Sequence, residues 1–193
     1  MPWEYDTNLS KVVWAITYLG VATVKGVFKD VRAELEIDAP DPRQWRVDVT
    51  IGAASLQSGY DRMDEHARSA DFLDVERYPT IRFVSRQVQV LEETALPLEG
   101  QPAGVTAWQP RADRFYLGGE VTLHGVTRPV ELEVWFRGEA SDIRGRTRRA
   151  FTATTSVNRG EFNVNVPPQV DPAKTVVGEQ IRISLEVIAN KLG

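Results

Sequence analysis

The side chains best suited to chemistry gather in one short segment, residues 61–75, which reads DRMDEHARSADFLDV. Its side chains of the acid–base or metal-ligand type include Asp61, Asp64, His66 and Asp71. If the fold brought them together, they would form an acid–base pair or a small metal site. However, the chain has only two histidines, on separate predicted elements, and no cysteine. We therefore predict no zinc or iron site and assign no catalytic residue.

The rest of the sequence also lacks the motifs of common enzymes. It contains no Gly-x-Ser-x-Gly elbow, no Walker loop and no His-Glu-x-x-His helix. The absence of cysteine excludes disulfides and thiolate catalysis. A net charge of -4 argues against a general nucleic-acid binder, and no apolar run approaches the roughly 20 residues that span a bilayer. We predict that the protein is not an enzyme and needs no cofactor.

The elements that must position the 61–75 segment are mostly strands. The clearest evidence lies in residues 114–138, where apolar residues alternate with polar ones on both sides of a His124-Gly125-Val126-Thr127 turn. Alternation with a period of two is typical of a strand that buries one face and exposes the other. We interpret His124 as a structural residue of the turn. The pattern occurs in eight segments: 12–18, 31–37, 47–51, 81–90, two within 114–138, 151–155 and 181–187.

Eight such strands with a single helix candidate predict an all-β fold, either an antiparallel barrel or a sandwich. Residues 61–75 form the helix candidate, because Met63, Ala67 and Ala70 recur at helical spacing. The Tyr78-Pro79 pair then favours an extended exit from the helix. We expect this short helix to lie over one end of a barrel and to cap its interior.

The length of the chain and one long loop define its domain organisation. A chain of 193 residues is long enough for one well-buried domain and short for two. We therefore assign residues 1–193 to a single domain. Residues 92–114 contain several prolines and glycines without clean periodicity, and we interpret them as a long loop insertion, either a lid or a disordered or loosely packed excursion.

Five stretches of the sequence resemble a known family in residue type and order. They are residues 6–10, VATVKGVFKDVRAELEID at 21–38, RMDEHARSADFLDVERYPTIRF at 62–83, GGEVTLHGVTRPVELEV at 118–134 and VNRGEF at 157–162. On these stretches the chain is identified as a member of the polyisoprenoid-binding, YceI-like family over almost its whole length. The resemblance implies an eight-stranded antiparallel, lipocalin-like β-barrel with a short capping helix. It also implies a carrier or sequestering protein that holds the long tail of a polyisoprenoid or fatty amphiphile.

The chain departs from the family pattern at several positions that bear on how a polar head group would be held. Leu9 and Tyr18 stand where family members often have histidine. Asn163 stands where a glycine usually follows the Arg-x-x-Phe run. Residues 92–114 replace what is generally a short hairpin.

An apolar tail inside such a barrel would contact inward-facing aromatic and aliphatic side chains. The residues that we predict to bind it are Trp14, Ile16, Val24, Phe28, Phe72, Leu73, Ile81, Phe83 and Phe151. Burial of a tail contributes roughly 0.8 kcal/mol per CH2 group, so its length rather than its polar contacts would dominate affinity. The alternative for each residue is an ordinary place in a packed core, which an eight-stranded barrel also permits.

A polar head group would need one or two anchors at the mouth of the barrel. The residues that we predict to supply them are Arg62, His66, Arg68, Asn158 and Arg159. The cations among them suit a pyrophosphate or a quinone oxygen. Arg62 and Arg68 have an alternative role, since both can pair with neighbouring carboxylates along the 61–75 helix.

The predicted function is non-enzymatic binding, transport or storage of a long-chain isoprenoid or other amphiphilic lipid, such as a polyprenyl compound, a quinone or a fatty amide. Two alternatives stay open. In one, the barrel is solidly packed and its outer surface binds a protein partner. In the other, the protein is a small lipid-acting hydrolase or isomerase built around His66 and the carboxylates of residues 61–75.

The expected partner is therefore a lipid rather than a nucleic acid. The basic run at residues 144–149 would touch anionic lipid head groups in a transient contact with a membrane surface, unless it is simply a solvated hairpin end. Exposed strand edges would allow a homodimer. Because no basic and apolar leader follows Met1, we expect a cytoplasmic location; a periplasmic or secreted protein would require that a leader had been removed.

Overall fold

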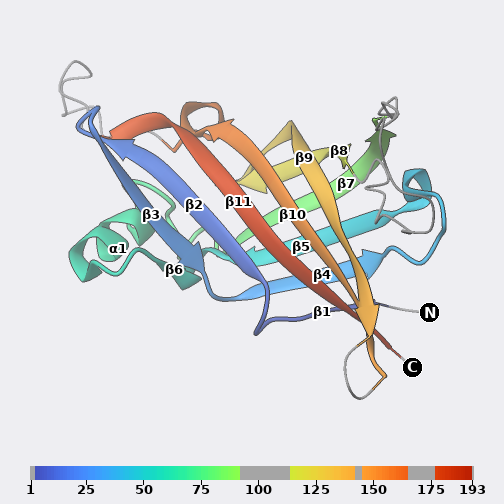
Figure 1. The fold of residues 1–193 in the computed structure, drawn as a ribbon. Helices are drawn as coiled ribbons and strands as arrows, with labels where there is room; N and C mark the ends of the chain where they lie inside the picture. The colour runs from blue at the N-terminus through green and yellow to red at the C-terminus, as the bar shows by residue number, and fades with distance from the viewer. Residues whose placement is uncertain (1–2, 92–113, 142–144, 165–176, 193) are drawn as a thin grey trace, which may run out of the picture.

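The computed structural model describes residues 3–91, 114–141, 145–164 and 177–192, whose strands form one antiparallel sheet (Figure 1). The strands are β1 (Trp3–Tyr5), β2 (Lys11–Tyr18), β3 (Ala22–Phe28), β4 (Val31–Glu36), β5 (Arg46–Gly52), β6 (Leu56–Gln57), β7 (Thr80–Val90), β8 (Arg114–Leu123), β9 (Val126–Ser141), β10 (Thr147–Asn158) and β11 (Val177–Lys191). The helices are α1 (Asp61–Arg68) and the short 3-10 helices η1 (Pro42–Gln44), η2 (Ala53–Ser55) and η3 (Arg159–Phe162). Of the loop insertion predicted at 92–114, only Arg114 lies within the described residues.

Eight strands close into a barrel. Hydrogen bonds join β1, β4, β5, β7, β8, β9, β10 and β11 in that order, and β1 pairs again with β11. The closing pair is short, because only residues 3–5 of β1 face residues 189–191 of β11. The prediction of an all-β, eight-stranded antiparallel barrel is therefore confirmed. None of the helices in the described ranges is long and apolar enough to cross a membrane.

The sheet forks next to the closing strand. β2 continues along β11 where β1 ends, and its other side pairs with β3, whereas β1 pairs with β4. β3 and β4 follow each other in the sequence but do not pair; β3 pairs instead with β6. The segment from β6 to α1 lies beside β3, on the side away from the chain ends (Figure 1). This arrangement makes the two ends of the barrel different.

β3 is a strand that the sequence pattern did not reveal. Its inward face includes Gly26, which pairs with Trp14 on β2. A Cβ atom at Gly26 would lie 2.6 Å from Cζ2 of Trp14 and 2.1 Å from the carbonyl oxygen of Gln57. The indole ring and β6 therefore occupy the space of a side chain, and only glycine fits. The missing side chain also removes the period-two signal from this segment.

The helix is shorter than the predicted 61–75. It ends at Arg68, because Ser69 has φ −65° and ψ 170°, and the Ser69 hydroxyl donates to the carbonyl oxygen of His66 at 2.7 Å. Beyond this cap, Phe72 and Leu73 turn toward the barrel and pack against a cluster around the buried Phe162. Burial of these two apolar side chains outweighs the helical periodicity on which the prediction depended.

The β8–β9 turn is also tighter than predicted. Its two central residues are His124 and Gly125, with φ 51° and 73°, whereas Val126 and Thr127 already belong to β9. The imidazole of His124 packs on the ring of Tyr78, with the two centroids 4.3 Å apart. The ring contact gives the histidine a packing role in this turn.

A hydrogen-bonded corner at Asp6 joins β1 to β2. Oδ1 of Asp6 accepts from the backbone N–H groups of Asn8 and Leu9, each at 3.0 Å, and Oδ2 accepts from Nδ2 of Asn190 at 3.0 Å. The hydrogen bond from Asn190 is the main reason that the pKa of Asp6 lies below its ordinary value, with the two backbone bonds adding to it and desolvation opposing it. The ionised carboxylate therefore stabilises the corner beside the closing strand.

We predict that this corner makes the fold less stable in acid. Because the pKa of Asp6 is lower in the folded chain, its contribution to the free energy of unfolding is complete above the unfolded pKa and is lost as the pH falls through the folded pKa. Urea unfolding, followed by tryptophan fluorescence between about pH 6 and pH 3, should show a smaller loss of stability in Asp6→Asn than in the unchanged protein. Equal losses in the two proteins would contradict the role of Asp6.

Candidate functional site

A large apolar cavity lies inside the barrel. Its volume is about 820 Å³, which is within the range of roughly 300–1,000 Å³ that is typical of ligand pockets. All eleven strands and α1 contribute side chains to its wall, and most of these side chains are aliphatic or aromatic. The lining residues with an ionisable group or a hydroxyl are Tyr5, Tyr18, Arg62, His66, Asp71, Thr155 and Arg159.

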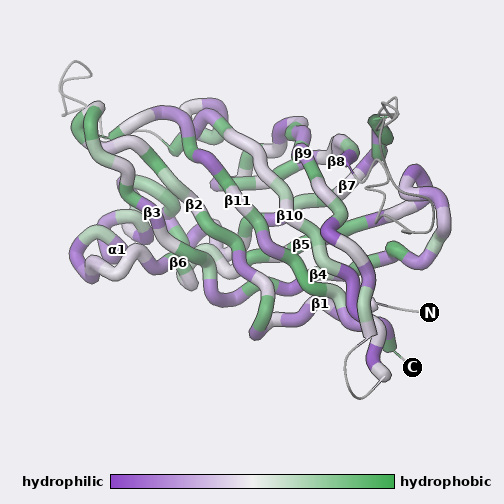
Figure 2. Tube along the Cα trace, viewed as in Figure 1, coloured by the Kyte–Doolittle hydropathy of each residue, from purple (hydrophilic) through white to green (hydrophobic). Residues whose placement is uncertain are grey.

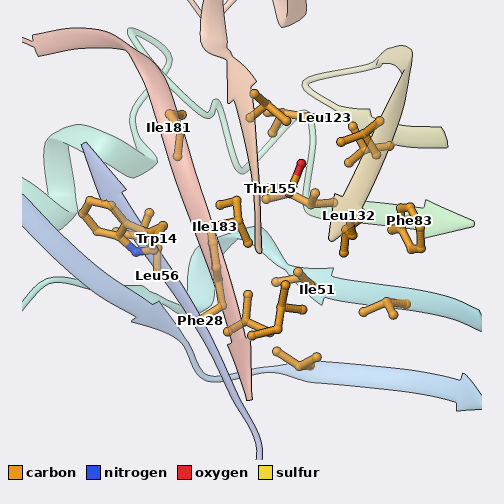
Figure 3. Close-up of a pocket in the computed structure, with 18 of the residues that line it drawn as sticks. Trp14, Phe28, Ile51, Leu56, Phe83, Leu123, Leu132, Thr155, Ile181 and Ile183 are labelled. Atoms are coloured by element: carbon orange, nitrogen blue, oxygen red, sulfur yellow. The ribbon is translucent and has the colours of Figure 1, made fainter. Parts of the chain in front are cut away.

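The cavity exists because inward-facing side chains meet open space rather than one another. Figure 3 shows Trp14, Ile51 and Ile183, from different strands, around this shared space. Ile51 and Ile183 are only partly buried although they line the interior, whereas a filled barrel of this size would cover them. The alternative of a solidly packed barrel therefore does not describe this interior.

The end of the barrel near the chain termini is packed. Trp45 contacts the rings of Phe115 and Phe151 edge-on, with centroid distances of 5.7 Å and 5.8 Å. The guanidinium of Arg149 lies 4.5 Å from the ring centroid of Trp3 and 5.8 Å from that of Trp45. Arg149 also donates from Nε to Glu139 Oε2 at 2.7 Å and from Nη1 to the carbonyl oxygen of Ile37. These contacts close this end with aromatic rings and one well-partnered cation.

Arg149 belongs to the basic run that we predicted could touch lipid head groups. Its guanidinium instead lies over the rings of Trp3 and Trp45, as part of the packed end of the barrel. The β9–β10 end that carries this run lies near the chain termini, on the opposite side of the barrel from α1 (Figure 1). The membrane contact predicted for this run stays untested, but its position is remote from the α1 end of the cavity.

The polar part of the lining lies mainly at the α1 end. Arg62 and His66 are exposed residues of α1 that also line the cavity, and Asp71 follows them. The imidazole of His66 contacts the Phe72 ring edge-on, with centroids 4.8 Å apart. The helix is anchored by buried Asp64, whose Oδ1 accepts from the Ser58 backbone N–H at 2.8 Å and from the Ser58 hydroxyl at 2.6 Å. An amphiphile with its tail inside would therefore have its head near α1.

All of the residues predicted to bind a tail line the cavity: Trp14, Ile16, Val24, Phe28, Phe72, Leu73, Ile81, Phe83 and Phe151. They come from β2, β3, β7 and β10 and from the turn after α1. The structure thus brings together residues that are far apart in the sequence. Their contact with a ligand stays a prediction.

The residues predicted to bind a head group fall into two sets. Arg62, His66 and Arg159 line the cavity, whereas Arg68 and Asn158 do not. Arg68 donates to the carbonyl oxygen of Leu56, and Oδ1 of Asn158 accepts from the backbone N–H of Gly160 at 2.9 Å. Arg68 and Asn158 therefore contact the backbone, whereas Arg62 and His66 line the cavity, and their contact with a head group stays a prediction.

Arg159 is buried, and its guanidinium holds neighbouring backbone segments together. Its Nε donates to the carbonyl oxygen of Gly178 at 2.9 Å, and its Nη1 donates to that of Val164 at 2.8 Å. Burial lowers the pKa of its guanidinium, and the charge of Glu179 opposes this shift. The side chain thus ties η3 to β11 at the cavity wall. The residue after this turn, Asn163, has φ 58°, a left-handed conformation that asparagine tolerates where glycine is otherwise preferred.

Some lining residues were not among the predicted site residues. Leu56 and Met63 lie on β6 and α1, and Trp45 follows η1. Met63 was recognised only as part of a helical stripe. Leu56 stands alone between two polar residues, so it carried no signal for a strand. Trp45 was detectable only as a large apolar residue just before a predicted strand. The place of Leu56 and Met63 in the site follows from the fork between β3 and β4, whereas Trp45 lies at the packed end near the chain termini.

The acid–base or metal cluster considered at residues 61–75 is not assembled as a metal site. Across the described residues there is no group of three or more His, Cys, Asp or Glu side chains that could hold a metal ion. Asp64 is directed to Ser58, and His66 contacts Phe72. What the arrangement offers chemically is an apolar container with a polar mouth.

Comparisons with known proteins agree with this architecture. The model of the YceI-like domain matches residues 3–189. A UPF0312 protein of Pseudomonas putida (strain W619) is 36% identical over 156 residues, which cover 81% of this chain and 71% of the relative. The crystal structure of BcnA from Burkholderia cenocepacia has a TM-score of 0.75 at 20% identity and covers 96% of this chain and 99% of that chain.

A polyisoprenoid binding domain from Saccharophagus degradans has a TM-score of 0.65 at 11% identity, covering 98% of each chain. These structural likenesses show the barrel fold, and the sequence match extends over nearly every described strand. The chain therefore belongs to the YceI-like domain family.

Proposed function

We propose that this protein binds a long-chain isoprenoid or similar amphiphilic lipid inside the barrel, without catalysing a reaction on it. The observation that carries this proposal is the apolar cavity of about 820 Å³, whose ionisable side chains lie mainly at the α1 end. One end is closed by aromatic rings and Arg149, so a tail would enter from the α1 end. Transport or storage of the lipid is the role that we infer from such a container.

A structural neighbour supports the choice of ligand class. The domain from Saccharophagus degradans that shares this fold is described as polyisoprenoid binding. Its likeness alone shows only the fold, so the support comes from the combination with this chain's own cavity lining. Val, Ile, Leu and Phe side chains around an unbranched or methyl-branched tail form no specific polar contacts. We therefore expect the protein to select ligands by the length and cross-section of the tail more than by its functional groups.

The cavity volume sets a limit on the length of the tail. A volume of about 820 Å³ holds roughly 25 to 30 groups of the size of a water molecule, at about 30 Å³ each. With five carbons in each isoprene unit, a prenyl tail of about five units would fill it. Each buried CH2 group contributes roughly 0.8 kcal/mol, so a tail of this length would outweigh the several kcal/mol of motional freedom lost on binding.

One prediction of this proposal concerns tail length. For prenyl alcohols of two to eight isoprene units delivered from cyclodextrin, affinity should rise by about tenfold or more per added unit and should level off near five units. Quenching of tryptophan fluorescence, with Trp14 in the cavity wall, would give the dissociation constants. In Ala33→Phe, where the added ring projects into the cavity, the plateau should come at a shorter tail. Affinity that does not depend on length would contradict an interior site.

Another prediction of this proposal concerns a charge placed in the cavity wall. Phe83→Asp should lower affinity for a four-unit prenyl alcohol by about a hundredfold or more, because the tail would desolvate an unpaired carboxylate. The matched control is Gln89→Asp, which introduces the same charge at an exposed position of the same strand, β7. Near-ultraviolet circular dichroism would verify that both variants fold.

If Phe83→Asp folds and binds the alcohol as tightly as Gln89→Asp does, the assignment of the tail to this cavity is wrong. If Phe83→Asp fails to fold, the Ala33→Phe variant tests the same assignment, since it adds volume without a charge.

A further inference from the structure

A hairpin at the rim of the cavity exposes apolar side chains to water. β2 and β3 are joined by a turn in which the Val21 N–H donates to the carbonyl oxygen of Tyr18 at 3.2 Å. Leu19 is 58% exposed and Val21 is 90% exposed. In Figure 2 the tip of this hairpin is coloured as hydrophobic and projects from the body of the barrel. Side chains left in water in this way contribute little to the burial that stabilises a fold.

The backbone of the turn makes its leucine unusual. The central residues Leu19 and Gly20 have φ 53° and 71°, and turns of this kind favour Asn-Gly or Asp-Gly because a larger side chain is strained at positive φ. The β8–β9 turn has the same geometry, but there the side chain of His124 packs on Tyr78. Leu19 is strained and also largely exposed. A strained apolar residue that the fold does not bury points to a role outside the fold.

The tip adjoins the open end of the cavity. Tyr18 and Val24, which flank the turn on β2 and β3, both line the cavity, and Val177, the partner of Tyr18 on β11, lines it too. In Figure 1 the β2–β3 hairpin ends on the same side of the barrel as α1, away from the chain termini. Leu19 and Val21 are thus placed where a tail would enter or leave.

The hairpin tip carries little charge, which suits contact with an uncharged surface. Residues 17–25 contain a single charged side chain, that of Lys25. Helix α1, on the same side of the barrel (Figure 1), carries Asp61, Asp64 and Glu65 against Arg62 and Arg68. The described residues of this hairpin and of α1 therefore carry no cationic surplus with which to bind anionic lipids. Contact through Leu19 and Val21 would depend on burial of apolar area instead.

We propose that the tip of the β2–β3 hairpin, Leu19 and Val21, docks the open end of the barrel onto a neutral lipid bilayer. The tail of an amphiphile would then pass between the bilayer and the cavity without crossing water. The transfer step rests on the proposed function of the cavity, whereas docking itself is a property of the hairpin.

Single fluorescent labels can show which end meets the bilayer, because the chain has no cysteine. Thr23→Cys carries a nitrobenzoxadiazole dye beside the tip, and Thr7→Cys carries it before the other end of β2; both residues are exposed. On addition of phosphatidylcholine vesicles, we expect brighter, blue-shifted emission from the label at residue 23 and no change at residue 7. An unchanged signal at residue 23, or equal changes at both positions, would overturn the proposal.

A double variant removes the apolar tip while keeping the turn. Leu19→Asn with Val21→Ser should fold at least as stably as the unchanged chain, since asparagine tolerates positive φ. Its uptake of geranylgeraniol from phosphatidylcholine vesicles should be at least about tenfold slower. The matched control is Leu9→Ser, because Leu9 is 50% exposed but lies before the other end of β2. Uptake by the double variant at the rate of Leu9→Ser would overturn the proposal.

Delivery without a bilayer separates docking from binding in the cavity. Geranylgeraniol presented by cyclodextrin should bind the double variant and the unchanged protein with the same Kd, and a weaker Kd in the variant would overturn a docking role. A requirement for phosphatidylglycerol in the vesicles would overturn the neutral surface. If the unchanged protein binds geranylgeraniol from neither source, the proposed function fails, and the labelled proteins alone decide whether the hairpin docks.

Discussion

The interior of this barrel is wider than its own side chains can fill, and the rest of the structure depends on that mismatch. An eight-stranded ring can be just filled or can hold one ligand, depending on the side chains that project inward. At the end near the termini, Trp45, Phe115 and Phe151 meet and fill the space. Toward α1, aliphatic residues such as Val24 and Ile183 line an open volume. The size of the inward-facing side chains, rather than strand geometry alone, therefore divides the barrel into a packed end and a cavity.

The mismatch has an energetic consequence that favours a ligand. Apolar side chains that line a cavity have fewer protein neighbours than those in a filled core, so they make fewer dispersion contacts with the protein itself. A tail inside the cavity would supply further contacts, and its binding to the folded state alone would stabilise the fold by mass action. The proposed exchange would take place on the side of the fork between β3 and β4, where β6 and α1 lie and where Arg62 and His66 line the cavity. Because Arg149, Trp3 and Trp45 close the opposite end, a bound amphiphile would have its head toward α1.

The parts of this arrangement that follow from local pattern could be predicted from the sequence. Period-two alternation identified the strands with unbroken apolar faces, and inward residues such as Phe83 and Ile81 could be assigned to the interior. β3 could not be detected by alternation, because Gly26 makes room for Trp14 and leaves a gap in the pattern. The end of α1 depends on tertiary burial of Phe72, which a helical stripe does not contain.

For the candidate site, the sequence indicated the region but not the role of each side chain. Cationic side chains drew attention to the α1 region, but charge alone could not separate Arg62, which lines the cavity, from Arg68, which donates to a backbone carbonyl. Nor could the sequence show that Arg149 closes the far end, since its partners Trp3 and Trp45 are distant in the chain. Such roles arise from packing between segments that only the folded chain brings together.

The most direct test of the container is native mass spectrometry of the full chain, expressed and purified without detergent, followed by extraction and identification of any released molecule. We predict a stoichiometric adduct whose mass corresponds to an amphiphile with a long apolar tail, and its loss on mild collisional activation. A protein that carries no adduct, and that gains none after incubation with prenyl and acyl lipids, would contradict the account.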